Sequence, residues 1–345
     1  MTTTNPKDSM TSTWRTADRN TWTIWHWWYE WVRVHPTDLD REVPVHDKSD
    51  PIPVVSHFQC HKWVLVHALW PLALHRLYCW TFGKNLHPLV ALLFYTVAYK
   101  MNGVHELIMI RDVGHTHGFL DGDKHARDGV PDHAVKKVFN SLISTLTVRS
   151  LMVVFFAYRR NEVPTLSWWL IPEIGFYLTI LDFWFYWYHR SMHQVDRLWK
   201  YHRTHHLTKH PNPLLTLYAD AEQEIFDIAV IPLLTYGTMK LMGFPLGFGD
   251  LWLCNQYQVF TELFGHSGLR VLWRPPTTAN WFLDLFDAQL VLEDHDLHHR
   301  KGWRNSFNYG KQTMLWDKAF GTHAERIESK NVNWSRQVTL KLWVI

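Results

Sequence analysis

Three short histidine clusters have the spacing of metal-binding sites. Their sequences are HRSMH at 189–193, HRTHH at 202–206 and HDLHH at 295–299. Residues three or four positions apart project from one face of a helix, so each cluster can direct several imidazoles at one ion. Together they supply more imidazoles than one ion can use, and about enough for two. The predicted ligands are His189, His193, His202, His205, His206, His295, His298 and His299.

The chemistry of imidazole narrows the metal. Neutral imidazole suits iron, zinc, copper and nickel, whereas the lack of thiolate ligands argues against copper(I) and iron–sulfur clusters. The two HxxHH triplets are the strongest evidence for a metal site. With 24 histidines in 345 residues, such a triplet is expected only about 0.1 times by chance. An HxxxH pair is expected roughly one or two times and is weak alone.

Three further residues are placed near these clusters by the sequence. His266 ends an apolar hairpin that returns the chain to the clusters, so we predict it as a ninth ligand. Glu262 lies one turn earlier and is a candidate to bind or bridge metal, the alternative being a capping or surface carboxylate. Asp182 lies two turns before His189 and is predicted to accept the second N–H of a metal-bound imidazole. Asp182 and Glu262 are the candidate catalytic carboxylates.

Other acidic residues and histidines have weaker assignments. Glu293, Asp294 and Asp296 surround His295 and are either partners of bound imidazoles or a solvated acidic run. A Gly/Asp-rich stretch between two hairpins contains further histidines, which we interpret as solvated loop residues rather than ligands. These are His115, His117, His125 and His133.

Apolar blocks of about 20 residues, the length needed to cross a bilayer as a helix, precede and separate the clusters. Short turns at 83–85, 161–164 and 243–245 pair them as three hairpins. An even number of crossings places the histidine clusters on one membrane face. Polar residues within the blocks are expected to face a protein interior or cavity. The blocks are Trp63–Phe82, Leu86–Ile110, Ser141–Tyr158, Trp168–Tyr188, Ile225–Met242 and Leu246–Phe264.

Composition supports a membrane protein. The chain is 47% hydrophobic and contains 21 Trp, a residue enriched at bilayer interfaces. The mean hydropathy of -0.22 is lowered by histidines and polar tails. A net charge of +3 provides no basic field for nucleic acid. The cysteines Cys60, Cys79 and Cys254 are odd in number and far apart, which argues against a disulfide framework.

The N-terminal region is predicted to form a separate unit. Residues 1–62 are interpreted as a polar tail, disordered over 1–20, and a Trp-rich segment, 21–34, that lies in the bilayer interface or packs on the protein. Residues 63–345 are interpreted as one integral membrane catalytic domain. We expect an all-α fold: a multi-spanning helical bundle of about six apolar segments, with the histidine-rich cap on the cytosolic face. The Lys and Arg residues flanking the clusters favour that orientation.

The clusters resemble the hallmarks of a known superfamily. The stretch from Asp182 to His193 is similar to the first histidine motif of the fatty acid hydroxylase / sterol desaturase superfamily, and 198–206, 266–268 and 295–299 match its later motifs. The closing segment 308–322 agrees as well. The three-residue gap within 189–193 resembles the sterol-oxidising branch, whereas YADAE at 218–222 departs from the His-Pro pair common there.

This resemblance implies a function. It implies a membrane-bound di-iron oxidoreductase in the endoplasmic reticulum, with its site facing the cytosol. It implies O2 as co-substrate and electrons from a separate cytochrome b5 or NAD(P)H reductase, for which the chain carries no haem-binding HPGG motif of its own. Arg190, Lys200 and Arg203 are candidate docking charges, the alternative being a solvated or lipid-headgroup role. The expected reaction is hydroxylation, desaturation or methyl oxidation of a lipophilic substrate such as a sterol, fatty-acyl lipid, terpenoid or polyketide.

Two alternatives stay open at this point. A zinc-dependent membrane hydrolase needs only three ligands and an open position, and the sequence has no HExxH motif. A non-catalytic membrane metal-binding protein is the other alternative, although none of the three clusters is broken. Dependence on O2 and a reductant separates the oxidoreductase from both.

Overall fold

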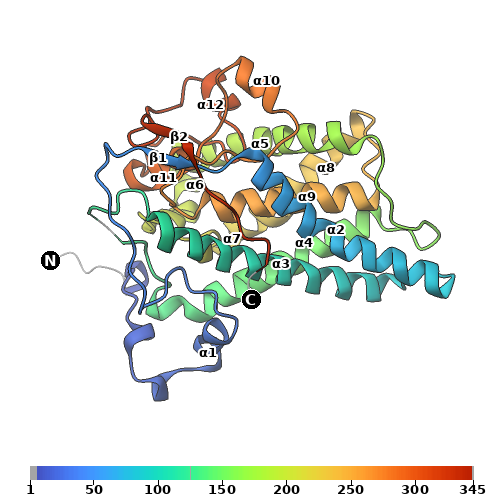
Figure 1. The fold of residues 1–345 in the computed structure, drawn as a ribbon, viewed down its shortest axis with the longest axis horizontal. Coiled ribbons are helices and arrows are strands. Elements are labelled where there is room, and N and C mark those ends of the chain that lie inside the picture. The colour runs from blue at the N-terminus through green and yellow to red at the C-terminus, as the bar shows by residue number, and fades with distance from the viewer. Residues whose placement is uncertain (1–5, 125, 344–345) are drawn as a thin grey trace.

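The computed structural model describes residues 6–124 and 126–343, and these fold into a mainly helical molecule (Figure 1). Long helices run side by side, and α9 lies among them with all 18 of its residues buried. The longer helices are α1 (Ile24–Trp31), α2 (His57–Phe82), α3 (Pro88–His117), α4 (Val135–Ala157), α5 (Leu170–Gln194), α8 (Ile231–Leu241), α9 (Phe248–Gly265) and α11 (Leu292–Lys301). The shorter elements are α6 (Asp196–His202), α7 (Ala221–Ile225), α10 (Asn280–Leu285), α12 (Leu315–Ala319), β1 (Ile52–Val54) and β2 (Val332–Gln337).

The first predicted hairpin forms as α2 and α3. Ser56 begins α2 by accepting a hydrogen bond from the N–H of Gln59, a standard N-cap. Gly83 ends the helix at a φ of 64°, a conformation that glycine adopts without steric cost. Pro88 starts α3 at the first turn, where a missing N–H costs nothing. These signals place the turn where the sequence predicts it, although α3 continues to His117.

The pairing of the other blocks as hairpins stays a prediction. Helices α4 and α5 lie where the third and fourth blocks were predicted, but among the longer helices α4 packs mainly on α3 and α9, and α5 packs mainly on α8 and α9. The fifth block is not one regular helix, because a π-helical turn at Phe226–Val230 separates α7 from α8. Such turns are rare and are enriched at functional sites. Here the turn follows Gln223, a residue of the histidine site described below.

The six predicted membrane crossings are not confirmed as a set. Among the described residues, only the segment Asp132–Ala157 is long and apolar enough to be a candidate span. The other helices carry buried polar residues that lower their average hydropathy, such as His75, Asn102 and Glu173. Their outer faces are nevertheless apolar. Large exposed side chains include Leu74, Leu77, Trp80, Leu89, Leu93, Phe155, Trp168, Ile171 and Leu241.

The expectation of an all-α fold needs one correction. Strands β1 and β2 pair in parallel, with Ile52 opposite Val332, and so join the N-terminal segment to the C-terminal end. This pairing could not be predicted from sequence, because the three residues of β1 are too few for a periodic pattern. The three cysteines are free and buried. The sequence predicts no disulfide framework, from their odd number and wide spacing.

The N-terminal region is packed rather than extended away from the protein. Trp14, in the stretch predicted to be disordered, is 5% exposed and donates its indole N–H to the carbonyl of Val130 at 3.0 Å. In α1, the rings of Trp25 and Trp28 each lie 4.9 Å from Phe139 of α4. The Trp-rich segment therefore contacts the protein through α4, and its location in the bilayer interface stays a prediction.

The histidines outside the clusters also differ from expectation. His115 and His117 belong to the last turn of α3 rather than to a loop. His115 is buried, and its two ring nitrogens contact the N–H of Asp38 at 2.9 Å and the carbonyl of Glu42 at 3.0 Å. His133 is exposed, as predicted, and His125 lies outside the described residues. None of the described three belongs to the groups described next.

Candidate metal centre

Four parts of the chain carry the predicted ligands to one place. The end of α5 supplies His189 and His193, and α6 with the 3-10 turn that follows it supplies the second cluster. His266 caps the C-terminus of α9, and α11 supplies the third cluster. All nine side chains are buried. Segments separated by up to about 100 residues therefore converge on one site.

The nine histidines form two groups. The first is His189, His193, His202, His206 and His298, and the second is His205, His266, His295 and His299. Within each group the candidate ligand atoms all lie within 4.8 Å of one another. Neighbours in sequence belong to different groups: His205 and His206 are divided, and so are His298 and His299. Each triplet thus contributes to both groups and holds them side by side.

Ring nitrogens face each other inside both groups. The Nε2 atoms of His189 and His202 are 3.0 Å apart, as are those of His206 and His298 in the same group. In the second group the Nε2 atoms of His266 and His295 are also 3.0 Å apart. Two unprotonated nitrogens at this distance repel each other. A cation between them removes the repulsion by accepting both lone pairs.

The opposite nitrogens of six rings are held by oxygen acceptors. The Nδ1 atoms of His189, His193, His266, His298 and His299 contact backbone carbonyls at 2.6–3.0 Å, and Nδ1 of His202 contacts Oε1 of Gln223 at 3.0 Å. The carbonyls belong to Tyr309, Trp303, Glu262, Phe307 and Thr208. A carbonyl only accepts, so each Nδ1 carries the proton and each Nε2 presents a lone pair.

These tautomers test whether the residues fit a metal. Nε2 of His193 and Nε2 of His299 are buried without a hydrogen-bond partner, although such atoms are normally satisfied. In both rings Nδ1 is held by a backbone carbonyl, and Nε2 is left without a partner. Metal-binding imidazoles are oriented in this way. The donor set contains imidazole nitrogen alone, in keeping with iron, zinc, copper or nickel. The residues fit two such ions.

Burial keeps the imidazoles neutral. Desolvation, followed by the proximity of other histidines, holds the pKa of His202, His206 and His298 well below the ordinary value of imidazole. The same causes lower the pKa of His205, His295 and His299. Neutral imidazole is the form that binds metal, so the site needs no deprotonation step at neutral pH.

Asp182 does not contact a histidine, in contrast to the expectation from its helical position. Its carboxylate accepts hydrogen bonds from the backbone N–H groups of Lys311, Gln312 and Thr313 at 2.6, 2.8 and 3.1 Å. The hydroxyl of Thr313 adds a fourth at 2.7 Å. This loop contains Tyr309, whose carbonyl holds His189. Asp182 thus holds the loop that carries the acceptor of His189.

Glu262 is not a member of either group. Its Oε2 lies 2.6 Å from Nη2 of Arg149, and its Oε1 lies 3.4 Å from Nζ of Lys311. It is not a surface carboxylate, because it is buried, and its partners are side chains rather than the backbone N–H groups that a capping carboxylate binds. Its backbone carbonyl, rather than its carboxylate, contacts the site by accepting the hydrogen bond of His266.

The acids around His295 have structural partners as well. Glu293 accepts hydrogen bonds from the backbone of 327–329, Asp294 pairs with Arg326, and Asp296 pairs with Arg127 and Arg300. These residues are buried, so the reading as a solvated acidic run is wrong. Main-chain carbonyls take the role that the sequence assigned to acids.

Comparison with known proteins agrees with this geometry. The sequence model described as "Fatty acid hydroxylase" matches residues 174–322, the part that supplies all nine histidines. The chain is 41% identical over 308 residues to the fatty acid hydroxylase vlmA of Lecanicillium sp, covering 85% of this chain and 84% of that protein. No solved structure matches.

More distant relatives align with about half of this chain. Methylsterol monooxygenase 2-1 of Arabidopsis thaliana is 30% identical over 191 residues, covering 51% of this chain and 65% of that protein. The very-long-chain aldehyde decarbonylase GL1-8 of Oryza sativa is 29% identical over 186 residues, covering 54% and 65%. The buried histidine groups and these similarities, above all the one that extends along most of the chain, establish that this protein belongs to the fatty acid hydroxylase family of oxidoreductases.

Proposed function

We propose that the chain is a membrane-bound di-iron oxidoreductase that uses O2 to oxidise a lipophilic substrate. The observation that carries the proposal is the division of nine buried histidines into two groups of ligand size. In this assignment the five-histidine group holds one iron and the four-histidine group holds the other. Bound iron would supply the activation of O2 that attack on an unactivated C–H bond requires. For hydroxylation, one substrate, one O2, two electrons and two protons give one alcohol and one water.

The protein's own residues prepare the site for this chemistry. Backbone carbonyls and Gln223 fix the orientation of six imidazoles, so that little reorganisation is needed when metal binds. Burial of all nine rings excludes water, which protects reactive intermediates from side reactions. Whether the substrate is hydroxylated, desaturated or oxidised at a methyl group depends on how it lies over the site.

The membrane setting is part of the same proposal. The exposed Leu, Trp and Phe side chains on α2, α3, α4, α5 and α8 suit contact with lipid, whereas charged residues such as Arg149 and Glu173 point inward. We propose that these helices enter the bilayer while α6, α11 and the histidine groups lie at its cytosolic face, and that the membrane is the endoplasmic reticulum. Helix α9, buried on every side, would be shielded from lipid.

Trp303 is the partly exposed residue through which we propose that electrons reach the histidine groups. This side chain is 38% exposed, and its carbonyl accepts the Nδ1–H of His193 at 2.7 Å. The ring of Trp199 lies 5.0 Å from Trp303 and 5.2 Å from His193. Lys209 places its ammonium 4.5 Å from the centre of the Trp303 ring. We propose that a separate cytochrome b5 or reductase docks here.

This placement revises the candidate docking charges. Arg203 is engaged by Asp8 at 2.6 Å and 2.9 Å, and Arg190 bonds to Tyr186 and Gln194. Lys209 lies directly on Trp303 and donates to the uncharged carbonyl of Gly302 at 3.0 Å, and exposed Lys301 is two residues from Trp303 along the chain. A positive surface of this kind attracts an acidic protein, and that attraction weakens as salt screens it.

Reversal of charge at Lys209 should slow reduction of the site. For Lys209→Glu we expect the second-order rate of reduction by soluble cytochrome b5 to fall by about tenfold at low salt, because electrostatic steering governs such encounters. The rate is measured by stopped-flow oxidation of the haem. Lys330→Glu, an exposed lysine paired with Glu325, serves as the control. Equal rates for wild type and Lys209→Glu at every ionic strength would contradict this docking site.

Loss of the Gln223 acceptor should weaken metal binding without removing a ligand. In Gln223→Met the Nδ1–H of His202 loses its partner, and outer partners of this kind contribute about 10–100-fold in metal affinity. Iron affinity is measured by competition with a chelator. Glu224→Gln is the control, since Glu224 contacts Ser141 rather than a histidine. An unchanged affinity in Gln223→Met would show that Gln223 does not orient His202.

The reaction class is tested by the requirement for O2. Purified protein in nanodiscs, loaded with ferrous iron and supplied with NADPH, reductase and cytochrome b5, is incubated with a lipid extract under 18O2. Hydroxylation adds one 18O atom to a lipid and stops without O2 or reductant. A product formed equally well under argon, or by the zinc-loaded protein, would instead support a hydrolase.

A further inference from the structure

An arginine-rich pocket lies where the segment after α1 crosses the last part of α3. Its volume is about 320 Å³, within the range of small-molecule sites. Four guanidinium groups line it, those of Arg15, Arg19, Arg33 and Arg111. The carboxylates that line it are those of Glu30, Asp38 and Asp40. The pocket therefore carries one more permanent cation than it has acids.

Neutral backbone carbonyls hold two of the guanidinium groups in place. Arg33 follows the end of α1 with a φ of 56°, a left-handed conformation that is unfavourable for a residue with a Cβ. Its carbonyl accepts a hydrogen bond from Nη1 of Arg111 at 2.7 Å. Arg15 donates from Nη2 to the carbonyl of Thr37 at 2.8 Å. These contacts fix the position of the two side chains but do not neutralise their charge.

Two of the three acids are already engaged. Glu30 pairs with Arg19 at 3.2 Å. Asp38 pairs with Arg41, which does not line the pocket, at 3.1 Å, and lies 3.4 Å from Arg111. One carboxylate is thus shared between two arginines.

Arg15 and Arg33 form no ion pair within residues 6–124 and 126–343. Desolvation is the main cause that lowers the pKa of Arg15, and the positive charge of Arg111 acts in the same direction. Arg111 is itself buried, and its Nε has no hydrogen-bond partner in the described part of the chain. Burial of a cation is costly unless it is paired. An anion in the pocket would supply the missing partner.

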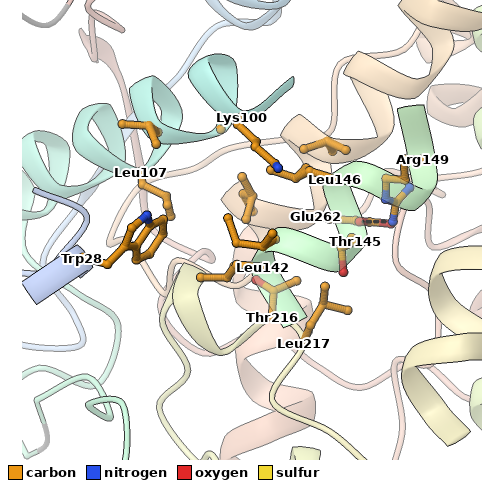
Figure 2. A pocket seen from close by; sticks show the side chains of 15 residues that line it. Trp28, Lys100, Leu107, Leu142, Thr145, Leu146, Arg149, Thr216, Leu217 and Glu262 are labelled. Carbon is orange, nitrogen blue, oxygen red and sulfur yellow. Dashed lines mark hydrogen bonds and ion pairs between the residues drawn. The ribbon is translucent and has the colours of Figure 1, made fainter. Parts of the chain in front are cut away.

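The other buried arginines show how this protein neutralises such a charge. Arg149 bonds to Glu262 at 2.6 Å, and Arg270 bonds to Glu328 at 3.1 Å. Figure 2 shows the first pair at the end of a separate, apolar pocket. Each has a carboxylate at hydrogen-bond distance, whereas the carboxylate nearest to Arg111 lies further away and is shared.

The arginine-rich pocket lies at the end of the helical bundle that also holds the histidines. The hydroxyl of Tyr29 in α1 donates to the carbonyl of Val135, the first residue of α4 (Figure 1). Arg111 belongs to the last two turns of α3. Just beyond that helix, the N–H of Leu120 donates to the carbonyl of Gly268, two residues after His266. In the membrane setting proposed above, this end of the bundle is at the level of the lipid head groups.

Apolar side chains border the charged pocket. Leu39 lines it and is 64% exposed. Arg19 lies 5.9 Å from the ring of Trp27, which stacks on Trp31, a side chain that is 65% exposed. Exposed Trp beside basic residues is typical of protein surfaces at a bilayer interface. A ligand with a charged head and an apolar tail fits both parts.

We propose that this pocket binds a phosphate group, and that a membrane lipid is the source of that phosphate. A phosphate presents several oxygens to guanidinium groups, which bind it in a bidentate manner. It would pair with Arg15 and Arg33, while the acyl chains lie along Leu39 and Trp31. The bound lipid fixes the N-terminal segment to the membrane surface. The phosphate site rests on the arginines alone, and only the lipid source rests on the proposed membrane setting.

The test compares three probes on the full-length protein in detergent, with dissociation constants measured by native mass spectrometry. Dioctanoyl phosphatidic acid carries the phosphate and the chains, dioctanoylglycerol lacks the phosphate, and glycerol phosphate lacks the chains. We expect phosphatidic acid to bind about tenfold or more tightly than either of the others, because hydrogen bonds to charged groups contribute at least that much.

Two variants remove a guanidinium group from the pocket. Arg15→Gln should weaken the binding of phosphatidic acid by about tenfold or more. Arg33→Gly should weaken it as well, and it should fold, because glycine adopts the left-handed conformation of residue 33 without steric cost. Arg336→Gln is the control, since Arg336 is an exposed arginine with no ion pair among the described residues. Circular dichroism checks that each variant is folded.

Equal affinity of wild type and both folded variants for phosphatidic acid would overturn the site. So would an equal loss in Arg336→Gln, or dioctanoylglycerol binding as tightly as phosphatidic acid. Glycerol phosphate that binds as tightly as the lipid, and loses affinity in Arg15→Gln, would support the phosphate site and refute the lipid source. Binding of phosphatidic acid by protein that holds no iron would support this site even if the proposed oxidation fails.

Discussion

Replacement of His206 by alanine should empty one metal site and leave the other occupied. His206 belongs to the five-histidine group, and His205, the residue before it, belongs to the four-histidine group. His205→Ala should therefore empty the other site. Loss of an outer partner alone weakens metal binding by about 10–100-fold, so loss of a direct ligand should weaken it by about 100-fold or more. Each variant is expected to retain about one iron and to lose oxidation activity.

Mössbauer spectroscopy of the 57Fe-loaded variants measures this result, because two iron sites with different ligand sets give separate quadrupole doublets. The doublet lost in His206→Ala should be the one retained in His205→Ala. His133→Ala is the control, since His133 is exposed and outside both groups. Loss of the same doublet in both variants, or retention of both, would mean that the two groups do not bind separate ions.

Removal of the Asp182 carboxylate should have the largest effect on stability. Asp182→Ala leaves the buried N–H groups of Lys311, Gln312 and Thr313 without their acceptor. An unsatisfied buried donor costs about 1–3 kcal/mol, so a loss of roughly 3 kcal/mol or more is expected. For a chain of this length that lowers the melting temperature by about 4 °C or more. The measurement is thermal denaturation of the detergent-purified protein.

The same variant should weaken metal binding, because the loop carries a partner of His189. Tyr309 accepts the Nδ1–H of His189, and its own N–H is held by Asp317 at 2.9 Å. Glu325→Ala, an exposed acid paired with Lys330, is the control for a lost carboxylate. A variant Asp182→Ala with unchanged melting temperature and unchanged iron affinity would show that Asp182 does not position this loop.

The histidine site could be predicted from sequence because its signal is local. Each cluster repeats at helical spacing, and imidazole chemistry limits what such a pattern does. The structure brings all nine predicted side chains together. The helices were predictable for the same reason, since Gly83 and Pro88 mark their ends within a few residues.

The rest of the site depends on contacts between distant segments. Gln223 reaches His202 across 21 positions, and the carbonyl of Tyr309 reaches His189 across 120. A backbone carbonyl is present at every residue, so no sequence pattern marks the ones that hold a ring. The sequence placed Asp182 on the correct face of α5, yet its partner is a loop folded back from the C-terminal end. The ion pair of Arg149 with Glu262 is likewise visible only after folding.

The division of the triplets between two groups follows from helix geometry combined with packing. Adjacent residues on a helix point about 100° apart, so His298 and His299 cannot face the same centre. Which group each one joins depends on where α5, α9 and the turn at His205–Leu207 place their own rings. The sequence predicts two ions, and the fold determines the ligand set of each.

The iron content of the wild-type protein, after anaerobic loading with ferrous iron and removal of excess metal, shows directly whether the chain binds two ions. Metal and protein are quantified on the same sample, by mass spectrometry and amino-acid analysis. Two groups of five and four histidines predict about two irons per chain, in keeping with two imidazole-rich sites. One iron or none, under conditions in which the protein keeps its helical structure, would contradict the di-iron account.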